Sequence, residues 1–223
     1  MEEFDFDTIF ADADWFHVSG IKPALNEELF LITKTALMKA KEKGFTTSCD
    51  LNYRALWPFD VARKKMTELI KYVDVCIGVE PLELLDGNGN DIKDRLPKPE
   101  KQEDYQDIVR QIQKRYNIQY LAMPHRNVLS VNRNRLSAML SDGTDFYKSD
   151  RVEVEIVDRV GAGDAFSAGI IYSLITMMEP QKAIEFATEC FALKRTIEGD
   201  VKLLEVSDIE YFIKNKDDLS IKR

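Results

Sequence analysis

Residues 157–169 read VDRVGAGDAFSAG, and this stretch decides how the chain folds. The alternating, β-branched residues just before it predict a strand, and the apolar residues 164–178 predict a helix. Gly161, Ala162 and Gly163 therefore lie at a helix N-terminus, where unpaired backbone N–H groups and the helix dipole favour an anion. Glycines also let the backbone approach a phosphate closely.

Asp164 follows these glycines, and its carboxylate is well placed to take a proton from a hydroxyl that attacks phosphorus. The alternative is an ordinary glycine-rich turn from strand to helix, in which Asp164 only stabilises the start of the helix. No G-x-x-x-x-G-K-[ST] pattern occurs in the chain, so a Walker-type phosphate loop is excluded.

Strand and helix patterns alternate along the rest of the chain. Such repeated units predict a three-layer α/β fold with a mostly parallel central sheet, in a single domain spanning residues 1–223. Residues 86–102 are rich in glycine and charge, and they predict an exposed loop. The expected strands are 14–19, 45–51, 73–79, 119–123 and 152–157, with a hairpin or meander over 128–140. The expected helices are 26–43, 61–72, 103–116, 164–178, 181–196 and 207–214.

Composition narrows the classes of partner. The 223 residues carry a net charge of −8, which argues against binding to nucleic acid or to an anionic membrane. We see no signal peptide and no apolar segment long enough to span a bilayer, so we expect a cytoplasmic protein. Cys49, Cys76 and Cys190 are odd in number and widely spaced, which favours buried free thiols.

Several motifs occur together in this chain. Residues 158–166 form the pattern D-x-x-G-A-G-D-A-F. It is accompanied by HVSGI at 17–21, DLNYR at 50–54 followed by LW at 56–57, and TIEGD at 196–200. Together these motifs resemble the ribokinase-like (PfkB-type) carbohydrate kinases, and within them the 2-keto-3-deoxygluconate kinases more closely than the ribokinases or fructokinases. The resemblance runs over nearly the whole chain, in the family's order.

The resemblance implies a ribokinase-like αβα sandwich and an ATP-dependent kinase that uses Mg²⁺. The implied reaction phosphorylates the terminal hydroxyl of 2-keto-3-deoxygluconate to the 6-phosphate, with a small-molecule sugar acid and ATP as partners and a homodimer as a compatible oligomer. The alternatives are a fructokinase or ribokinase of the same fold, and an inactive nucleotide-binding fragment. The last alternative arises because roughly the first third of the family pattern, which carries the lid over the sugar, has no counterpart in these residues.

By resemblance, Asp164 is the general base, and Gly161, Ala162 and Gly163 form the anion hole for the transferred phosphate. Arg54 is expected to lie between the sugar acid and the nucleotide, because a guanidinium binds a carboxylate or phosphate bidentately. The alternative for Arg54 is a surface ion pair.

The remaining site residues also come from the resemblance. Asn52 and Tyr53 flank Arg54 and are implicated in the nucleotide site. Asp200 corresponds to a substrate-contacting aspartate, and a loop acid at the end of a helix is the alternative. Ile21 matches a position in the substrate pocket, although an apolar residue after a strand is also typical of the core.

Two segments depart from the family pattern. The Asn-x-x-Glu motif linked to magnesium and phosphate should fall near residues 77–83, where the asparagine is absent and Glu80 or Glu83 could stand in. The metal ligands therefore stay unassigned. The usual glycine-rich phosphate loop is replaced by MPHRN at 123–127, where Arg126 could supply positive charge to the nucleotide.

Overall fold

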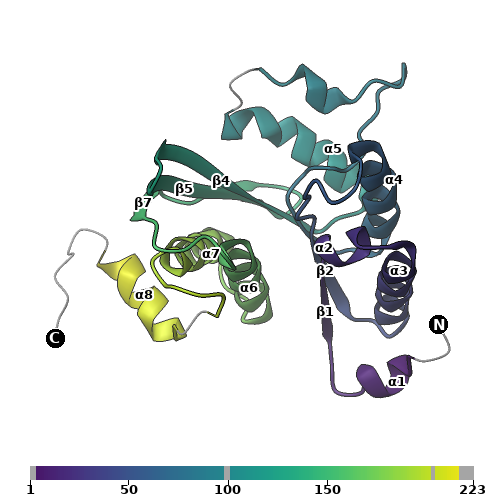
Figure 1. Cartoon of the computed structure of the whole chain (residues 1–223), viewed down its shortest axis with the longest axis horizontal. Helices are drawn as coiled ribbons and strands as arrows, with labels where there is room; N and C mark the ends of the chain where they lie inside the picture. The colour runs from purple at the N-terminus through teal and green to yellow at the C-terminus, as the bar shows by residue number, and fades with distance from the viewer. Residues whose placement is uncertain (1–3, 98–100, 202–203, 216–223) are drawn as a thin grey trace. The chain divides into compact units, whose positions relative to one another are not determined.

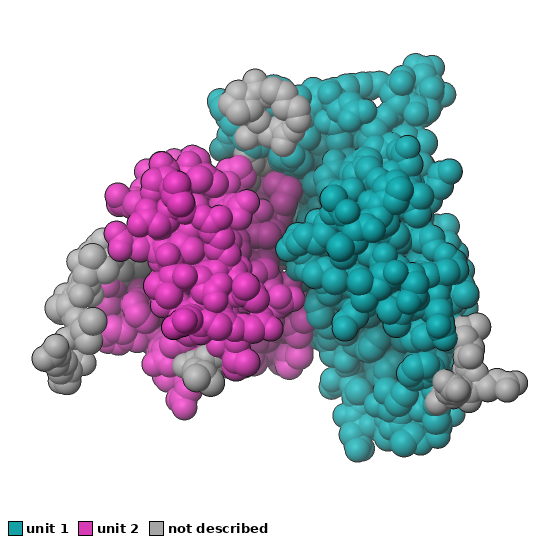
Figure 2. All heavy atoms as spheres, viewed as in Figure 1, with its two compact units in different colours: residues 1–122, 141–145 teal, residues 123–140, 146–223 magenta. Residues whose placement is uncertain are grey.

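The structure, a computed structural model, describes residues 4–97, 101–201 and 204–215. The chain divides into two compact units, one of residues 1–122 with 141–145 and the other of residues 123–140 with 146–223 (Figure 2). The prediction of a single domain stays a prediction. Within the described ranges, no helix has the length and apolar character needed to cross a bilayer.

Parallel strands alternate with helices in the first unit (Figure 1). Helix α3 packs on β1 and β2 and also contacts α4. The elements of this unit are α1 (Phe6–Ile9), β1 (Trp15–Ser19), α2 (Ile21–Ala24), α3 (Glu27–Glu42), β2 (Thr46–Asp50), α4 (Phe59–Leu69), η1 (Ile70–Tyr72), β3 (Val75–Ile77), η2 (Ile92–Arg95), η3 (Gln102–Tyr105), α5 (Gln106–Tyr116) and the start of β4 (Tyr120–Ser130).

The register of these strands aligns their carboxyl ends. Ser19 of β1 lies opposite Asp50 of β2, and Asp50 lies opposite Ile77 of β3. Ile77 in turn lies opposite Ala122, so β3 is parallel to the start of β4. The residues of β3 are all buried, as expected for a strand covered on both faces. The α/β fold and its mostly parallel sheet are thereby confirmed.

Local signals set the ends of α3. The side chain of Asn26 accepts a hydrogen bond from the N–H of Leu29 at 2.8 Å, which caps the helix. Gly44 follows the helix with φ +79°, a left-handed conformation that favours glycine. The predicted helix over 26–43 is therefore confirmed to within one residue at each end.

The second unit is dominated by helices α6 and α7, which pack along one another (Figure 1). Helix α7 also packs against α8, β6 and β7. The elements that complete this unit are β5 (Arg133–Ser141, with its last residue in the first unit), β6 (Phe146–Lys148), β7 (Val152–Glu155), α6 (Ala162–Ile175), α7 (Pro180–Lys194) and α8 (Val206–Lys214).

The sheet of the second unit differs from a purely parallel one. Strand β5 neighbours β4 and β6, and β7 pairs with β5 in antiparallel register, with Leu136 opposite Val152. The predicted strand at 119–123 and the first arm of the predicted hairpin form one continuous strand, β4. Three short elements, α1, α2 and β6, are absent from the prediction because three or four residues show no measurable periodicity.

Of the predicted exposed loop 86–102, residues 98–100 lie outside the described residues, and the described remainder is not exposed throughout. Asp91 is 4% exposed and Lys93 is 5% exposed. The short helix η2 carries Lys93 inward, where its ammonium donates to Asp91 Oδ2 at 2.9 Å. The prediction of exposure is therefore wrong for these two residues, because charged side chains become buried when they find a partner.

Candidate functional site

The predicted anion hole is an open helix N-terminus in the second unit. Gly161 is the N-cap residue of α6, and no side chain caps this end of the helix. The first backbone bond of the helix runs from the N–H of Ala165 to the oxygen of Gly161, at 2.9 Å. Within the described residues, the N–H groups of Ala162, Gly163 and Asp164 have no acceptor. These donors can receive an anion, which the helix dipole also favours.

Gly161 approaches Asp200 so closely that no side chain fits between them. A Cβ placed on Gly161 would lie 2.8 Å from the backbone oxygen of Asp200 and 2.9 Å from its Oδ1. The φ of Gly161 is +70°, a conformation that side-chain-bearing residues rarely adopt. The structure therefore brings together two of the predicted site residues, which are far apart in the sequence.

Asp158 braces the turn that leads into α6. Its Oδ1 accepts hydrogen bonds from the N–H groups of Arg159 and Val160, at 2.6 and 3.0 Å. Its Oδ2 accepts from the N–H of Gly199 at 2.9 Å. The backbone donors of Val160, Gly199 and Arg159 hold the pKa of the Asp158 carboxyl below its ordinary value. The carboxylate of Asp158 is therefore hydrogen-bonded to the backbone, whereas that of Asp164 has no such bond in the described residues.

Asp164 has an exposed carboxylate that makes no hydrogen bond or ion pair with the residues described. It borders a cavity of about 380 Å³ in the second unit, and Asp200 borders the same cavity. The other lining residues are Gly161, Ala165, Ala168, Gly169, Tyr172, Phe186, Cys190, Leu204, Val206 and Ile209. A free carboxylate beside three open N–H donors can accept a proton while a neighbouring anion is held.

A group of arginines adds positive charge to the second unit. Arg195 is buried, and burial lowers the pKa of its guanidinium to about 10, with further lowering from Arg126 and Arg159. Arg126 is exposed on β4, and its positive charge contributes to the lowered pKa of Arg195. Its proposed contact with nucleotide stays a prediction, and its place in a positively charged cluster is compatible with that role.

The remaining predicted residues lie in the first unit, at the carboxyl ends of β1 and β2. The hydroxyl of Ser19 accepts from the Nδ2 of Asn52 at 3.2 Å and from the N–H of Ile21 at 3.5 Å. Asn52 adopts φ +39°, and its N–H donates to Asp50 Oδ1 at 3.0 Å. Ile21 and Asn52 are therefore neighbours, as the convergence of strand ends in a parallel sheet predicts.

Tyr53 and Arg54 continue from this strand end. The hydroxyl of Tyr53 donates to the backbone oxygen of Trp57 at 3.3 Å, and its ring packs edge-on against Phe59. Arg54 is exposed, and its only hydrogen bond in the described residues is to the oxygen of Tyr53, at 3.2 Å. No described carboxylate pairs with Arg54, so the alternative of a surface ion pair has no support. Its guanidinium is available to an anion.

Both segments 50–54 and 161–164 follow strands in the sequence, and ligands of parallel sheets lie at the carboxyl ends of strands, so the sequence predicts that they converge. This stays a prediction, because the two segments belong to different units. In the first unit the structure groups Ile21, Asn52, Tyr53 and Arg54. In the second it groups Gly161, Asp164 and Asp200.

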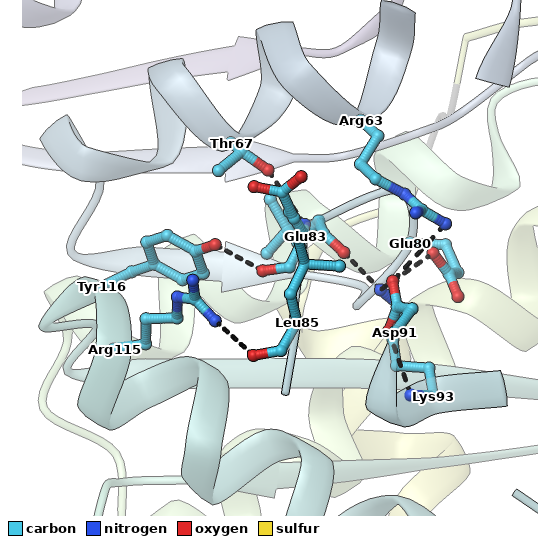
Figure 3. A network of polar contacts seen from close by, with 10 residues as sticks. Arg63, Thr67, Glu80, Glu83, Leu85, Asp91, Lys93, Arg115 and Tyr116 are labelled. Atoms are coloured by element: carbon cyan, nitrogen blue, oxygen red, sulfur yellow. Dashed lines mark hydrogen bonds and ion pairs between the residues drawn. The ribbon is translucent and has the colours of Figure 1, made fainter. Parts of the chain in front are cut away.

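Glu80, one of the two candidate stand-ins for the absent asparagine, is paired with a cation. Figure 3 shows Glu80 beside Lys93, whose ammonium lies 3.5 Å from Glu80 Oε2. Burial raises the pKa of the Glu80 carboxyl, and Lys93 opposes that rise. The same ammonium bonds to Asp91, which also lies 3.4 Å from the guanidinium of Arg63. No group of three or more His, Cys, Asp or Glu side chains that could hold a metal ion occurs in the described part of the chain.

Two buried cations near Asp200 receive no contact in the sequence prediction, in which the resemblance places only Lys194, on the helix that lines the adenine pocket in such kinases. Lys194 is completely buried at the end of α7, and its ammonium donates to backbone oxygens of the loop that carries Asp200. Arg195 follows it and is also buried. Two adjacent cations at the end of an apolar helix, in the sequence FALKRT, are the signal that could have drawn attention to them.

The chain matches the pfkB family carbohydrate kinase profile over residues 1–205. It is 31% identical to a 2-dehydro-3-deoxygalactonokinase of Haloferax volcanii, over 94% of this chain and 60% of that protein. It is 27% identical to a 2-dehydro-3-deoxygluconokinase of Bacillus subtilis, over 86% of this chain and 53% of that protein. A crystal structure of 2-dehydro-3-deoxygluconokinase from Thermotoga maritima superimposes with a TM-score of 0.86 and 38% identity, covering 96% of this chain and 64% of that one. The chain thus spans between half and two thirds of the length of these relatives.

Proposed function

Because the chain belongs to the pfkB family of carbohydrate kinases, we propose that it catalyses the ATP-dependent phosphorylation of a six-carbon 2-keto-3-deoxy sugar acid. The proposed substrate is 2-keto-3-deoxygluconate, also named 2-dehydro-3-deoxygluconate, and the product is its 6-phosphate. The γ-phosphoryl group moves from ATP to the terminal hydroxyl oxygen, and ADP leaves. The reaction belongs in the cytoplasm, where ATP is abundant.

Asp164 is the proposed general base. Its unengaged carboxylate takes the hydroxyl proton while the hydroxyl oxygen attacks the γ-phosphorus. The open N–H groups of Ala162, Gly163 and Asp164 stabilise the charge on the transferred phosphoryl oxygens, and fixed backbone donors do this without reorganisation. The single observation that carries the proposal is this unengaged carboxylate beside uncapped donors at one helix N-terminus.

The proposed substrate contacts are those of Arg54, Asp200 and Ile21. A guanidinium is the natural partner of the sugar-acid carboxylate, and Arg54 has no ionic partner among the residues that the structure describes. Asp200 accepts hydrogen bonds from sugar hydroxyls in this scheme. Asn52, Tyr53 and Arg126, with Arg54 and the helix N-terminus, are assigned to the nucleotide.

Mg²⁺ enters this scheme as part of the ATP complex. The described residues do not fit a protein-built metal site, since Glu80 is paired with Lys93 and no acidic cluster is present among them. Magnesium bound to the phosphates supplies charge neutralisation there.

A direct test measures ADP release with ATP·Mg²⁺, with and without 2-keto-3-deoxygluconate. The Asp164→Asn variant should lose about 10³-fold in kcat while still binding ATP, because the amide cannot accept the proton. Equal rates in the variant and the unchanged chain would refute the assignment of Asp164. ATP binding without sugar-dependent turnover in the unchanged chain would support the alternative of a nucleotide-binding fragment.

The choice of sugar needs its own comparison. The Haloferax volcanii relative is named for the galactonate epimer, so both epimers belong in the assay, together with fructose and ribose. Arg54→Ala should raise the KM of a sugar acid about 10- to 100-fold and leave the KM of a neutral sugar unchanged, since only the acid has a carboxylate to lose. A preference for fructose or ribose that Arg54→Ala does not alter would favour the fructokinase or ribokinase alternative.

The proposed homodimer is tested by the molar mass of the chain in solution. A mass twice that of one 25.7 kDa chain, measured by light scattering, is the expected result.

A further inference from the structure

Lys194 is the most deeply buried cation near the proposed anion hole. It is the last residue of α7, and its exposed fraction is 0%. Its Nζ donates to the backbone oxygen of Gly199 at 2.5 Å and to that of Ile197 at 3.3 Å. No carboxylate of the described residues lies within ion-pair distance of it. A buried ammonium held only by carbonyl oxygens is costly in free energy, and the carboxylate of Asp158, whose pKa the charge of Lys194 helps to lower, offsets part of that cost.

The ammonium holds two carbonyl groups of the loop 197–200 in place. The oxygen of Gly199 receives the Lys194 hydrogen bond, and the N–H of Gly199 donates to Asp158 Oδ2 at 2.9 Å. Gly199 is therefore fixed from both sides, in a left-handed conformation with φ +83°. Asp200 follows directly, so its contact with Gly161 depends on this clamp.

The stem of Lys194 also lies directly beside Gly161. A Cβ placed on Gly161 would be 3.4 Å from Lys194 Cε. Asp164 and Asp200 border the same cavity, so an arriving phosphoryl anion meets two carboxylates there. A buried positive charge at this position offsets that repulsion, and it is screened little because water does not reach it.

We propose that Lys194 is a positioning residue for phosphoryl transfer: its buried ammonium holds Asp200 against Gly161 and supplies the positive charge that lets an anion occupy the N-terminus of α6. This inference rests on the proposed kinase function. The chemistry that the site would hold is the transferred phosphoryl group, and Lys194 acts on it through the loop and through its charge.

Substitutions of Lys194 separate the effect of its positive charge from the effect of its packing. Lys194→Met keeps a side chain of similar length and removes the ammonium, and we expect kcat to fall about 100-fold with a smaller change in the KM of the sugar. Lys182→Met on the same helix is the matched control, because Lys182 is exposed, and it should change kcat less than twofold. Methylammonium added to the buffer should raise the kcat of Lys194→Ala at least tenfold. Tetramethylammonium, which has no N–H donor, should not raise it.

The outcomes separate this inference from the proposed function. If the unchanged chain phosphorylates a sugar acid and folded Lys194→Met keeps kcat within twofold, the inference is overturned and the kinase function stands. If methylammonium restores nothing in folded Lys194→Ala, the ammonium is not the active feature and the inference is likewise overturned. If the unchanged chain transfers no phosphate to any sugar acid, the proposed function fails, and a measurement on the unchanged chain decides the inference.

That measurement follows the ammonium resonances of buried lysines by NMR, and it also serves if the variants at 194 do not fold. Lys93 is the other buried lysine described, and its signal is assigned by its loss in Lys93→Met. The Lys194 signal should shift when ADP with aluminium fluoride, a mimic of the transferred phosphoryl group, is added. A signal that stays unchanged while this probe saturates the chain would overturn the inference.

Discussion

Gly161 carries two constraints at once, one from its own backbone and one from a distant residue. Its φ of +70° disfavours any side chain, and Asp200 occupies the space that a Cβ would need. The first constraint is local, and a glycine-rich turn suggests it. The second depends on a loop 39 residues further along the chain. The close approach keeps an acidic residue beside the donors of α6.

Replacing Gly161 should therefore lower stability and ATP binding more than replacing a glycine that has only the backbone constraint. Gly161→Ala is expected to destabilise the second unit by about 1–3 kcal/mol and to weaken ATP binding, because Asp200 must move. Gly44→Ala is the matched control, since Gly44 has φ +79° and no atom within 4 Å of the added Cβ. It should cost about 1–2 kcal/mol and leave binding unchanged. Equal effects of the two variants on ATP binding would contradict this view.

Asp158 predicts a pH dependence of stability. Its pKa lies below the ordinary 3.8 because the N–H groups of Val160, Gly199 and Arg159 bond to the charged form. The carboxylate therefore contributes stability above pH 3.8, and this contribution is lost as the pH falls through the lowered pKa.

The test compares the unfolding free energy of the unchanged chain with that of Asp158→Asn. The difference should be constant from about pH 7 to pH 5 and should shrink as the solution becomes more acidic than 3.8. If the difference in unfolding free energy between the two proteins grew on acidification, the pKa of Asp158 would be raised rather than lowered, and the prediction would be wrong.

Helices α6 and α7 approach closely because one residue at their contact has no side chain. A Cβ placed on Gly169 would lie 2.8 Å from Ala187 Cα and 3.2 Å from Cys190 Sγ. The pattern of apolar residues predicts both helices but not how near they come, since nearness depends on which two faces meet.

Gly169→Ala tests this contact. Alanine favours helix over glycine by about 1 kcal/mol, yet the variant should lose about 1–3 kcal/mol of unfolding free energy because the added methyl group forces the helices apart. Gly87→Ala, where nothing lies within 4 Å of the added Cβ, should change stability by less than about 0.5 kcal/mol. Chemical denaturation measures both, and a stabilised Gly169→Ala would show that the helices can separate without cost.

At the scale of the whole molecule, the three cysteines report separately on the two units. Cys49 and Cys76 are completely buried in neighbouring strands of the first unit, and Cys190 is 3% exposed in α7 of the second. Burial raises the pKa of the thiols of Cys49 and Cys76, which leaves them unreactive while folded. The prediction of three buried free thiols is confirmed.

Thiol labelling in increasing denaturant should therefore resolve the opening of each unit. We expect no rapid reaction of any cysteine in buffer, a common midpoint for Cys49 and Cys76, and a different midpoint for Cys190, read by mass spectrometry of labelled peptides. A single midpoint for all three thiols would mean that the two units unfold together.

Most elements could be predicted because their signals are local. The alternation in β7 and the long amphipathic pattern of α3 are readable without any distant contact, and so is the cap at Asn26. The glycine turn before Asp164 identifies the helix N-terminus for the same reason. The short elements α1, α2 and β6 fall below the length at which a pattern can be recognised.

The sequence alone determined the order of strands and helices, the family motif and the open N-terminus of α6, because backbone propensity, hydrophobic period and glycine placement act over a few residues. Tertiary structure alone decided that Lys194 and Lys93 are buried, that Glu80 is paired with a cation, and that Asp200 lies against Gly161. Burial and pairing of these groups depend on which residues distant in the chain come within a few ångströms, and only the packed fold specifies those distances.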